Sequence, residues 1–306
     1  MEPKIAVQIQ FDADSSAMLR SAAKAGFPAV SIGFGSFEGF VFDDWREKIV
    51  RLKEELASLG LLCVMTHAPY YDLRVSAEYV TPAIDLSIAR CLEATALLGA
   101  EIMAMHPRGY YSAGSRYEGE KSGLNLAGLT PEIPAACFSC GVEDLARSVE
   151  TNIAYWKPLA ARARELGCLI GVENLPVWPG WGMTFCSNDP GAQIAIIDGL
   201  GEGACGVWDF GHANLANGDD PGPLRRLGRR VRGLHVHDNK GASDDHAIPF
   251  EGTIDWPAQM KELRAAGFEG YVMLELAYTY GGHIEAFLAR AYRAAIRLDK
   301  LLRNGA

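Results

Sequence analysis

The chain alternates between two hydrophobic periods from one end to the other. Eight short runs are apolar or β-branched at nearly every position, which is typical of parallel strands buried on both faces. These runs are IAVQIQ, AVSIGFG, LCVMTHA, EIMAMH, LIGVENL, GVWDF, GLHVHD and YVMLEL. Amphipathic stretches lie between them, and several begin at Asp or Ser and end at Gly, as helices do. The alternation predicts an α/β fold, a (β/α)8 TIM barrel in which right-handed crossovers join parallel strands.

An open, doubly wound sheet would show the same alternation of strands and helices. Such a sheet usually carries a glycine-rich phosphate loop after its first strand, and the segment IQFDADSS is not glycine-rich. The hydrophobic fraction of 49% is enough for one substantial core, and α/β barrels reach this length undivided. We therefore expect residues 1–306 to form a single TIM-barrel domain.

One segment interrupts the alternation of predicted strands and helices. Residues 109–141 are rich in Gly, Ser, Tyr and Pro and show neither a helical nor a strand period. A connection of this length in a compact domain is usually functional or partly disordered. Because it follows the strand that ends near His106, we expect a loop insertion on the catalytic face that covers a substrate. A surface insertion or an oligomer contact is the alternative.

Charge and cysteine content limit the cellular compartment and the classes of partner that we expect. The net charge of −9 gives no global attraction for nucleic acid or an anionic membrane. The first residues, MEPKIAVQIQ, lack a charged leader followed by a long apolar stretch, and no later segment has the roughly 18 uncharged apolar residues of a membrane span. The odd total of 7 cysteines argues against a fully paired disulfide framework. We expect a cytoplasmic protein without a membrane span, and extended nucleic-acid binding is disfavoured.

Side chains of the metal-ligand type recur where the apolar runs end. In a parallel barrel the carboxyl ends of the strands all open onto one face, so residues far apart in sequence converge there. The candidates from six different strands are His67, His106, Glu173, Asp209, His235 and Glu275. Imidazole nitrogen combined with carboxylate oxygen suits Mn²⁺, Zn²⁺, Fe²⁺ or Co²⁺ better than Ca²⁺, which prefers oxygen alone. The sequence predicts a site for a divalent transition metal.

The order of these motifs resembles a known superfamily. The segments are THAPY, MAMHP, VENLP, WDFGHANL, LHVHDN, SDDHAIPFEGTIDW and LEL, and with them the resemblance covers about residues 4 to 300. Their combination is similar to the xylose isomerase-like barrel superfamily, which contains sugar and sugar-phosphate isomerases and epimerases together with the type IV apurinic endonucleases. The resemblance implies the same barrel fold and a metal-dependent reaction.

The epimerase branch supplies the leading hypothesis. Ketose 3-epimerases and their relatives bind one divalent metal through four residues, which match Glu173, Asp209, His235 and Glu275. The resemblance implies an isomerase or epimerase of a sugar or sugar derivative, with Mn²⁺ or Zn²⁺ as cofactor and Co²⁺ or Fe²⁺ as further candidates. Glu173 and Glu275 would remove and return a proton next to a carbonyl, through a metal-stabilised enediolate.

Other residues are candidates for binding the substrate or a second metal. They are His67, His106, His212, Asp244, His246, Trp178, Trp181 and Lys240. The two tryptophans would stack on sugar C–H surfaces, and Lys240 would hold a phosphate or carboxylate or be a solvated loop charge. His237 is expected on the other side of its strand from His235, as a supporting residue. Many epimerases of this type carry an arginine after the histidine motif, whereas this chain reads HVHDNKGASDDH, which weighs against a ketose epimerase specifically.

The endonuclease branch supplies the competing hypothesis, a multinuclear-zinc phosphodiesterase. These enzymes assemble three zinc ions from nine ligands, and each has a counterpart here: His67, His106, Glu173, Asp209, His212, His235, Asp244, His246 and Glu275. The acidic chain and the few basic residues after His67 and Glu173 weigh against it. A third hypothesis, a non-catalytic sugar-binding barrel, is disfavoured by the complete four-residue metal set. Barrels of this class often form homo-oligomers, which the sequence leaves open.

Overall fold

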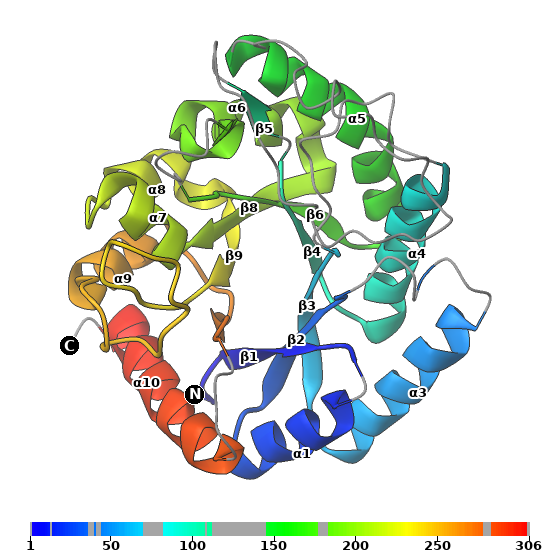
Figure 1. Cartoon of the computed structure of the whole chain (residues 1–306), viewed down its shortest axis with the longest axis vertical. Coiled ribbons are helices and arrows are strands. Elements are labelled where there is room, and N and C mark those ends of the chain that lie inside the picture. Colours follow the sequence, from blue (N-terminus) through cyan, green and yellow to red (C-terminus); the bar gives the residue numbers. More distant parts are fainter. Residues whose placement is uncertain are drawn as a thin grey trace.

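Parallel strands form a barrel at the centre of the molecule, and helices surround it in the computed structural model (Figure 1). The structure describes residues 2–12, 14–35, 40, 44–69, 82–107, 109–111, 145–176, 183–277 and 283–304. The barrel strands are β1 Ile5–Gln10, β2 Ala29–Gly33, β3 Leu62–His67, β4 Ile102–Met105, β6 Leu169–Glu173, β8 Ala204–Asp209, β9 Val231–His235 and β10 Val272–Leu274. Each overlaps one of the eight apolar runs of the sequence, and β8 and β9 begin two residues before their runs.

The strands follow the order β10-β1-β2-β3-β4-β6-β8-β9, and each neighbouring pair is parallel. The two outer strands meet through Val236, which follows β9: its N–H donates to Met273 at 2.9 Å, and its carbonyl accepts from the N–H of Glu275 at 3.2 Å. These bonds close the ring at the level of His235 and Glu275. The predicted (β/α)8 barrel is confirmed, whereas the extent of the domain over all of residues 1–306 stays a prediction.

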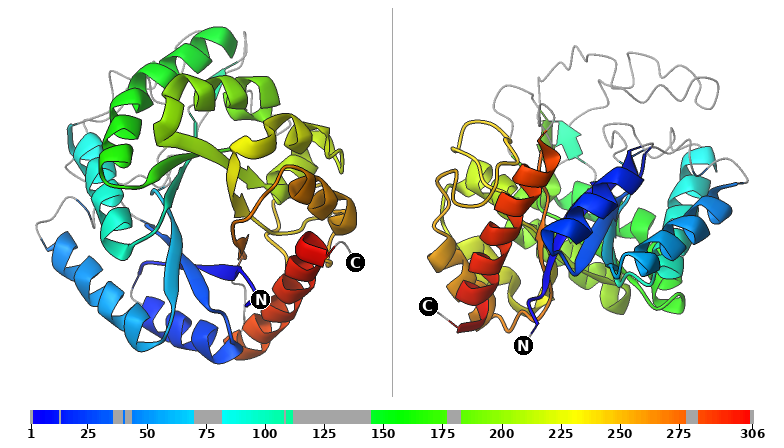
Figure 2. Two further views of the ribbon diagram at one scale, coloured as in Figure 1. Left: turned by 180° about the vertical axis from the view of Figure 1, so that it is seen from behind. Right: turned by 90° about the horizontal axis from the view of Figure 1, so that it is seen from below.

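Helices cover the outside of the barrel (Figure 2). They are α1 Ser15–Ala25, α3 Trp45–Ser58, α4 Pro82–Leu98, α5 Leu145–Glu165, α6 Pro190–Leu200, α7 Phe210–Asn217, α8 Gly222–Leu227, α9 Trp256–Ala265 and α10 Ile284–Asn304, with 3-10 turns at Cys186–Asn188, Gly201–Gly203 and Gly228–Arg230. The amphipathic pattern did not predict α6, whose sequence PGAQIAIIDGL is apolar around most of its circumference. None of the described helices has the length and hydropathy that a membrane-spanning segment requires.

The segment 109–141 begins with a strand. Gly109–Tyr111 forms β5, which pairs in antiparallel fashion with β7, Met183–Phe185, outside the barrel sheet (Figure 2). Neither strand is predictable from the sequence, because three residues are too few to show a period of two. The rest of the segment, residues 112–141, lies outside the described residues, so its role over a substrate stays a prediction.

Small and medium-sized side chains fill the interior of the barrel. They are Ala6, Ala29, Met65, Ile102, Ala104, Cys205, Val207 and Met273. Gly171 belongs to the same layer, since a Cβ at this position would lie 2.5 Å from Val207 Cγ2 and 2.8 Å from Ile102 Cγ2. Burial raises the pKa of the Cys205 thiol to about 12, as it does for Cys63, and both free cysteines pack as small hydrophobes. This packed interior forms the floor beneath the strand ends.

Candidate metal centre

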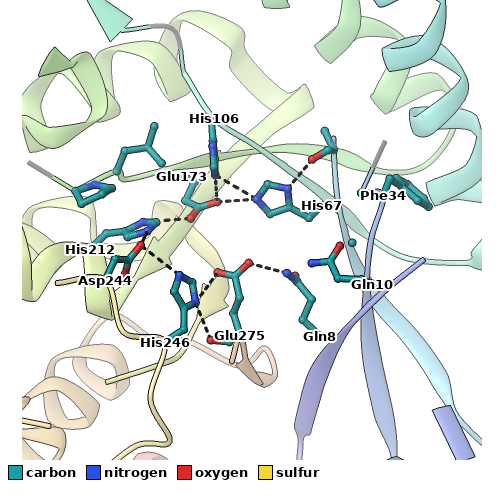
Figure 3. Close-up of a pocket in the computed structure, with 15 residues that line it drawn as sticks. Gln8, Gln10, Phe34, His67, His106, Glu173, His212, Asp244, His246 and Glu275 are labelled. Carbon is teal, nitrogen blue, oxygen red and sulfur yellow. Dashed lines mark hydrogen bonds and ion pairs between the residues drawn. The ribbon is translucent and has the colours of Figure 1, made fainter. Parts of the chain in front are cut away.

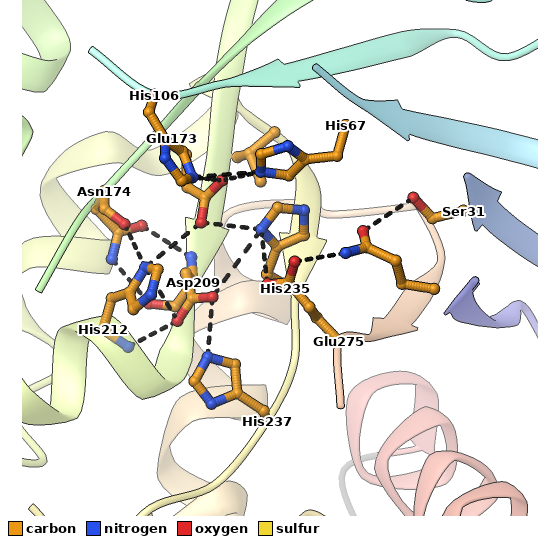
Figure 4. Close-up of polar contacts among 12 residues, drawn as sticks. Ser31, His67, His106, Glu173, Asn174, Asp209, His212, His235, His237 and Glu275 are labelled. Atoms are coloured by element: carbon orange, nitrogen blue, oxygen red, sulfur yellow. Dashed lines mark hydrogen bonds and ion pairs between the residues drawn. The ribbon is translucent and has the colours of Figure 1, made fainter. Parts of the chain in front are cut away.

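The six predicted ligand residues meet at the carboxyl end of the barrel, as the strand-end rule requires (Figure 4). They occupy the last residue of a strand or the first residue beyond it: His67, His106, Glu173, Asp209, His235 and Glu275. Since all barrel strands run in the same direction, their ends share one mouth. The structure therefore brings the six side chains together. With His212, Asp244 and His246 they form three neighbouring groups, two of which share Glu173.

The central group consists of Glu173, Asp209, His235 and Glu275. Nδ1 of His235 lies 3.0 Å from Glu173 Oε1, 3.4 Å from Glu275 Oε2 and 3.9 Å from Asp209 Oδ2. Oε1 of Glu173 and both ring nitrogens of His235 are buried and have no hydrogen-bond partner within the described part of the chain. Buried polar atoms almost always have a partner, so carboxylates around an unpaired imidazole nitrogen fit the shell of a bound cation.

The second group consists of His67, His106 and Glu173. Nε2 of His67, Nε2 of His106 and Oε2 of Glu173 are each 3.2 Å from one another. Ligand atoms of a tetrahedral ion with bonds of about 2.0–2.1 Å lie roughly 3.3 Å apart, so the spacing matches that of a metal site. Nδ1 of His67 faces the carbonyl of Ala68 at 2.7 Å, which places the ring hydrogen on Nδ1 and leaves Nε2 as a lone-pair donor.

The third group consists of His212, Asp244 and His246. Oδ2 of Asp244 lies 3.2 Å from Nε2 of both histidines. Nδ1 of His212 faces the carbonyl of Asn174 at 2.9 Å, and Nδ1 of His246 faces the carbonyl of Glu275 at 3.1 Å. A backbone carbonyl thus orients each ring as it does in His67, with Nε2 turned toward the shared carboxylate.

The Asp-x-x-His spacing of the DFGH motif has a local cause. Strand β8 ends at Asp209 and helix α7 begins at the next residue, so Asp209 is the N-cap of that helix. Its Oδ1 accepts the backbone N–H of His212 at 2.6 Å, the bond that an N-cap makes to the third residue beyond it. Asn174 holds the same turn to the end of β6, because its side chain exchanges two 2.8 Å hydrogen bonds with the backbone of Asp209. Sequence reasoning missed Asn174, although it follows Glu173 directly in VENLP.

The loop that carries Asp244 and His246 is anchored by Asp238, the aspartate of HVHD. Oδ2 of Asp238 accepts hydrogen bonds from the backbone N–H of Phe250 and from Nε1 of Trp256, both at 2.9 Å. Asp238 is fully buried and also pairs with Ala247 through two backbone bonds. The role of this motif aspartate is therefore to hold the loop, and the loop presents Asp244 and His246 to the mouth.

Opposite charges balance within the centre. Burial would raise the pKa of Glu173, but the charges of His235 and His106 outweigh it and hold that pKa well below its usual range. Burial also opposes protonation of His235, yet Glu173 and Glu275 raise its pKa to about 9. Burial disfavours the anion of Asp244 too, but hydrogen bonds from His212 and His246 lower its pKa. Glu173 and Asp244 are therefore anionic at neutral pH, and the proton on His235 takes the place of the positive charge that a divalent cation would supply.

A cavity of about 310 Å³ opens above the three groups (Figure 3). Its lining includes Gln8 and Gln10 from β1 and Phe34 after β2. Seven of the candidate ligands also line it: His67, His106, Glu173, His212, Asp244, His246 and Glu275. Asp209 and His235 are buried beneath them. Nε2 of Gln8 donates to Glu275 Oε1 at 2.6 Å, and Oε1 of Gln8 accepts from the hydroxyl of Ser31 at 3.3 Å. The two glutamines were not predicted as site residues, although they stand out as alternate polar positions in the apolar run IAVQIQ.

The remaining predicted residues have different outcomes. Lys240 is exposed and is not among the residues that line the cavity. Trp178 and Trp181 lie outside the described residues, so their stacking role stays a prediction. His237 corrects the expectation made for it: its Nε2 lies 3.0 Å from Asp209 Oδ2, on the same side as His235. The reason is that residues two apart on an extended chain share a side, so the period of two places His237 with His235.

Two curated proteins share sequence with parts of the chain. The uncharacterized protein MJ1311 of Methanocaldococcus jannaschii is 25% identical over 218 residues, which cover 69% of this chain and 64% of that protein. Fructoselysine 3-epimerase of Escherichia coli O157:H7 is 42% identical over 78 residues, which cover 24% of this chain and 28% of that enzyme. The chain thus spans less than two thirds of the length of either relative.

Solved structures share the fold over nearly the whole chain. A D-tagatose 3-epimerase-like protein has a TM-score of 0.70 at 18% identity and matches 98% of both chains. An AP endonuclease of family 2 from Brucella melitensis has a TM-score of 0.65 at 17% identity and matches 94% of this chain and 97% of its own. At these identities the likeness shows the fold alone. A family model matches residues 19–298, and the chain therefore belongs to the xylose isomerase-like TIM barrel family.

Proposed function

We propose that the protein is a divalent-metal-dependent isomerase or epimerase of a sugar or sugar derivative. The observation that carries this proposal is the central group, in which Glu173 from β6 and Glu275 beyond β10 approach the same imidazole nitrogen from different strands. The partial sequence match to fructoselysine 3-epimerase supports the same class of reaction.

Glu173, Asp209, His235 and Glu275 would hold one divalent transition metal. The mixture of one nitrogen and several carboxylate oxygens favours Mn²⁺ or Zn²⁺, with Co²⁺ and Fe²⁺ as further candidates. When bound, such an ion supplies Lewis acidity that polarises a carbonyl and a neighbouring hydroxyl group. The orphaned Oε1 of Glu173 and Nδ1 of His235 are the structural support for this assignment.

Proton transfer is assigned to Glu173 and Glu275. The local charges lower the pKa of both carboxylates, that of Glu275 to about 2, so each is an anion that accepts a proton at neutral pH. The two side chains come from separated strands, and a substrate between them would lose a proton to one and receive a proton from the other, which inverts the carbon. Gln8 fixes one oxygen of Glu275 through its 2.6 Å hydrogen bond, which keeps that carboxylate aimed at the cavity.

The cavity favours a small, neutral polyol as substrate. A volume of about 310 Å³ is at the lower end of ligand pockets, which usually hold about 300–1,000 Å³. Among its described lining residues there is no Lys or Arg to pair with a phosphate. Gln8, Gln10 and the histidines offer donors and acceptors for hydroxyl groups, and His67, His106, His212, Asp244 and His246 would bind the substrate or a second metal.

Deuterium exchange tests the proposal directly. The Mn²⁺-loaded protein is incubated in deuterated water with a panel of ketoses and ketose-amines, and NMR follows deuterium at the carbon next to the carbonyl. We expect incorporation with at least one substrate, and its loss in Glu173→Gln and in Glu275→Gln. Absence of exchange across the panel would overturn the proposal, and sugar binding without exchange would favour a non-catalytic barrel.

A second candidate, a multinuclear-zinc phosphodiesterase, is favoured by one specific observation. The second and third groups each place three ligand atoms at spacings compatible with a separate ion, in addition to the central group. Metal content measured by mass spectrometry on unstripped protein separates the candidates. One ion per chain supports the isomerase, whereas three zinc ions together with cleavage of an abasic-site oligonucleotide would establish the phosphodiesterase.

A further inference from the structure

His237 contacts a residue of the central group and a residue of the third group. It is fully buried, and its Nε2 donates to Oδ2 of Asp209 at 3.0 Å (Figure 4). On its other side the ring stacks on His246, with 3.8 Å between ring centroids and 12° between ring planes. One side chain therefore contacts a central-group carboxylate by a hydrogen bond and a third-group imidazole by its face.

The stacking geometry shows that His237 and His246 do not share an ion. The lone pair of an imidazole nitrogen lies in the plane of its ring, so a bound ion lies in that plane at about 2.0–2.1 Å from the nitrogen. The two ring planes are nearly parallel, and the ring centroids are 3.8 Å apart. No single position therefore lies in both planes and also within bonding distance of a nitrogen from each ring. His237 is close to His212, Asp244 and His246, yet its geometry is that of a support rather than a fourth ligand.

Gly211 supplies the space for this ring. A Cβ on Gly211 would lie 1.9 Å from Cε1 and 2.2 Å from Nδ1 of His237. Gly211 lies within helix α7 and has no positive φ, so the neighbouring ring and not the backbone conformation excludes a side chain. The glycine of DFGH and the second histidine of HVHD therefore depend on each other across two strand ends.

We propose that His237 is a positioning residue that fixes Asp209 for metal binding, and that Gly211 serves this role by leaving room for the ring. The inference rests on the proposed metal-dependent function. Oδ1 of Asp209 is already held by the backbone of His212, and the bond from His237 to Oδ2 completes the restraint, so the carboxylate cannot rotate away from the mouth. The stack on His246 sets the angle of the donor ring and adds no ligand atom.

Two substitutions separate the hydrogen bond from the stack. His237→Phe keeps a flat ring on His246 but removes the donor to Asp209, whereas His237→Gln keeps a donor near the Nε2 position and removes the stack. Loss of a residue that orients a metal ligand typically lowers metal affinity by about 10- to 100-fold. We expect that loss of Co²⁺ affinity, with a changed visible absorption spectrum, for His237→Phe, and affinity within about threefold of wild type for His237→Gln.

Substitutions at Gly211 test the same positioning role independently. Gly211→Ala should weaken Co²⁺ binding by a similar factor in the wild-type chain, because the added methyl group displaces the ring. In a His237→Ala background the same substitution should cause no further loss, since the space is then free, and the two changes are not additive. Thermal melts of the metal-free variants check that each one folds.

The outcomes distinguish this inference from the proposed function. Co²⁺ titration needs no substrate, so a wild-type protein that binds Co²⁺ but exchanges no deuterium overturns the proposed function and not the role of His237. Wild-type Co²⁺ affinity and spectrum in folded His237→Phe, or additive effects of the changes at positions 211 and 237, would overturn the positioning role alone. A folded wild-type protein that binds no Co²⁺, Mn²⁺ or Zn²⁺ would overturn both.

Discussion

Nδ1 of His235 lies 3.0 Å from Oε1 of Glu173, both atoms are buried, and neither makes a hydrogen bond to any described residue. Buried partners at this distance normally align to share a hydrogen. Here the two atoms are close without forming a hydrogen bond, as two ligands of one ion are. Glu173 also turns its other oxygen to His67 and His106, so it is the residue that the central and second groups share.

The first prediction concerns that shared carboxylate. Glu173→Gln removes the negative charge while keeping the shape, and we expect Mn²⁺ or Zn²⁺ affinity to fall by more than about 100-fold, beyond the effect typical of a supporting residue. Isothermal titration calorimetry on metal-stripped protein measures this. Glu47→Gln, on the exposed surface of α3, is the matched control and should bind as wild type does. Unchanged affinity in the Glu173 variant would contradict the assignment of the central group.

The second prediction is the pH dependence of metal binding. His235 and His246 have their pKa raised to about 9, so both carry a proton at pH 7 in the metal-free protein. A cation must displace such protons, and linkage gives about a tenfold rise in affinity per pH unit for each proton released. We expect affinity to increase from pH 6 to about pH 9 and then to level off. Calorimetry in buffers of different ionisation enthalpy counts the protons, and a flat profile would refute the displacement.

The same groups set the stability of the metal-free protein. A raised histidine pKa stabilises the folded state fully below the unfolded value of 6.5, and this contribution is lost as the pH rises through about 9. Glu275, with its pKa lowered to about 2, contributes above 4.5 and loses that contribution as the pH falls through about 2. The melting temperature of metal-free protein should therefore be highest between about pH 4.5 and 6.5. Saturating Mn²⁺ should move the maximum to higher pH, and an unmoved maximum would argue against binding at His235.

The third prediction concerns Gln8, which reaches Glu275 from the neighbouring strand β1. Gln8→Met keeps the length of the side chain but removes the 2.6 Å hydrogen bond to Oε1 of Glu275. We expect metal affinity to fall by about tenfold, because a supporting partner orients a ligand without being one. Gln10→Met changes the same cavity wall two residues further along, and it should alter substrate KM more than metal affinity. Equal metal affinity in both variants would show that Gln8 does not orient Glu275.

Much of this arrangement was predictable from the sequence. Eight apolar runs predict eight strands, and the convergence of parallel strand ends predicts that His67, Glu173 and His235 meet, because both follow from chain direction alone. The strands β5 and β7 were not predicted because they are too short to show alternation. The apolar helix α6 lacked the contrast between two faces on which helix prediction depends.

The finer geometry of the site depends on the folded backbone. The carbonyls of Ala68 and Asn174 orient His67 and His212, and no pattern of side chains shows where a carbonyl points. Gln8 and Gln10 were visible as polar interruptions of the first run, so that signal was present in the sequence. The stack of His237 on His246 joins residues from a strand end and a separate loop, and its angle arises only in the folded protein.

The fourth prediction links the packing of the barrel interior to the metal centre above it. Gly171 lies two residues before Glu173 on the same side of β6, and a Cβ there would overlap Val207 and Ile102. Overpacking of this kind costs about 1–3 kcal/mol, so Gly171→Ala should lower the urea-unfolding free energy by that amount. The strand must shift to relieve the overlap, which moves Glu173, and metal affinity should fall as well.

The control for this prediction is Gly35→Ala, whose Cβ would meet Gln10 Oε1 at an ordinary 3.6 Å and no other atom of the described residues within 4 Å. It should change the free energy of unfolding by less than about 0.5 kcal/mol, as surface substitutions usually do. Urea denaturation of both metal-free variants gives the stability, and calorimetry gives the metal affinity. Loss of stability without loss of affinity in Gly171→Ala would show that the floor of the barrel adjusts without displacing the Glu173 carboxylate. Loss of both would show that the small residue at position 171 is needed to keep the Glu173 carboxylate in position at the mouth of the barrel.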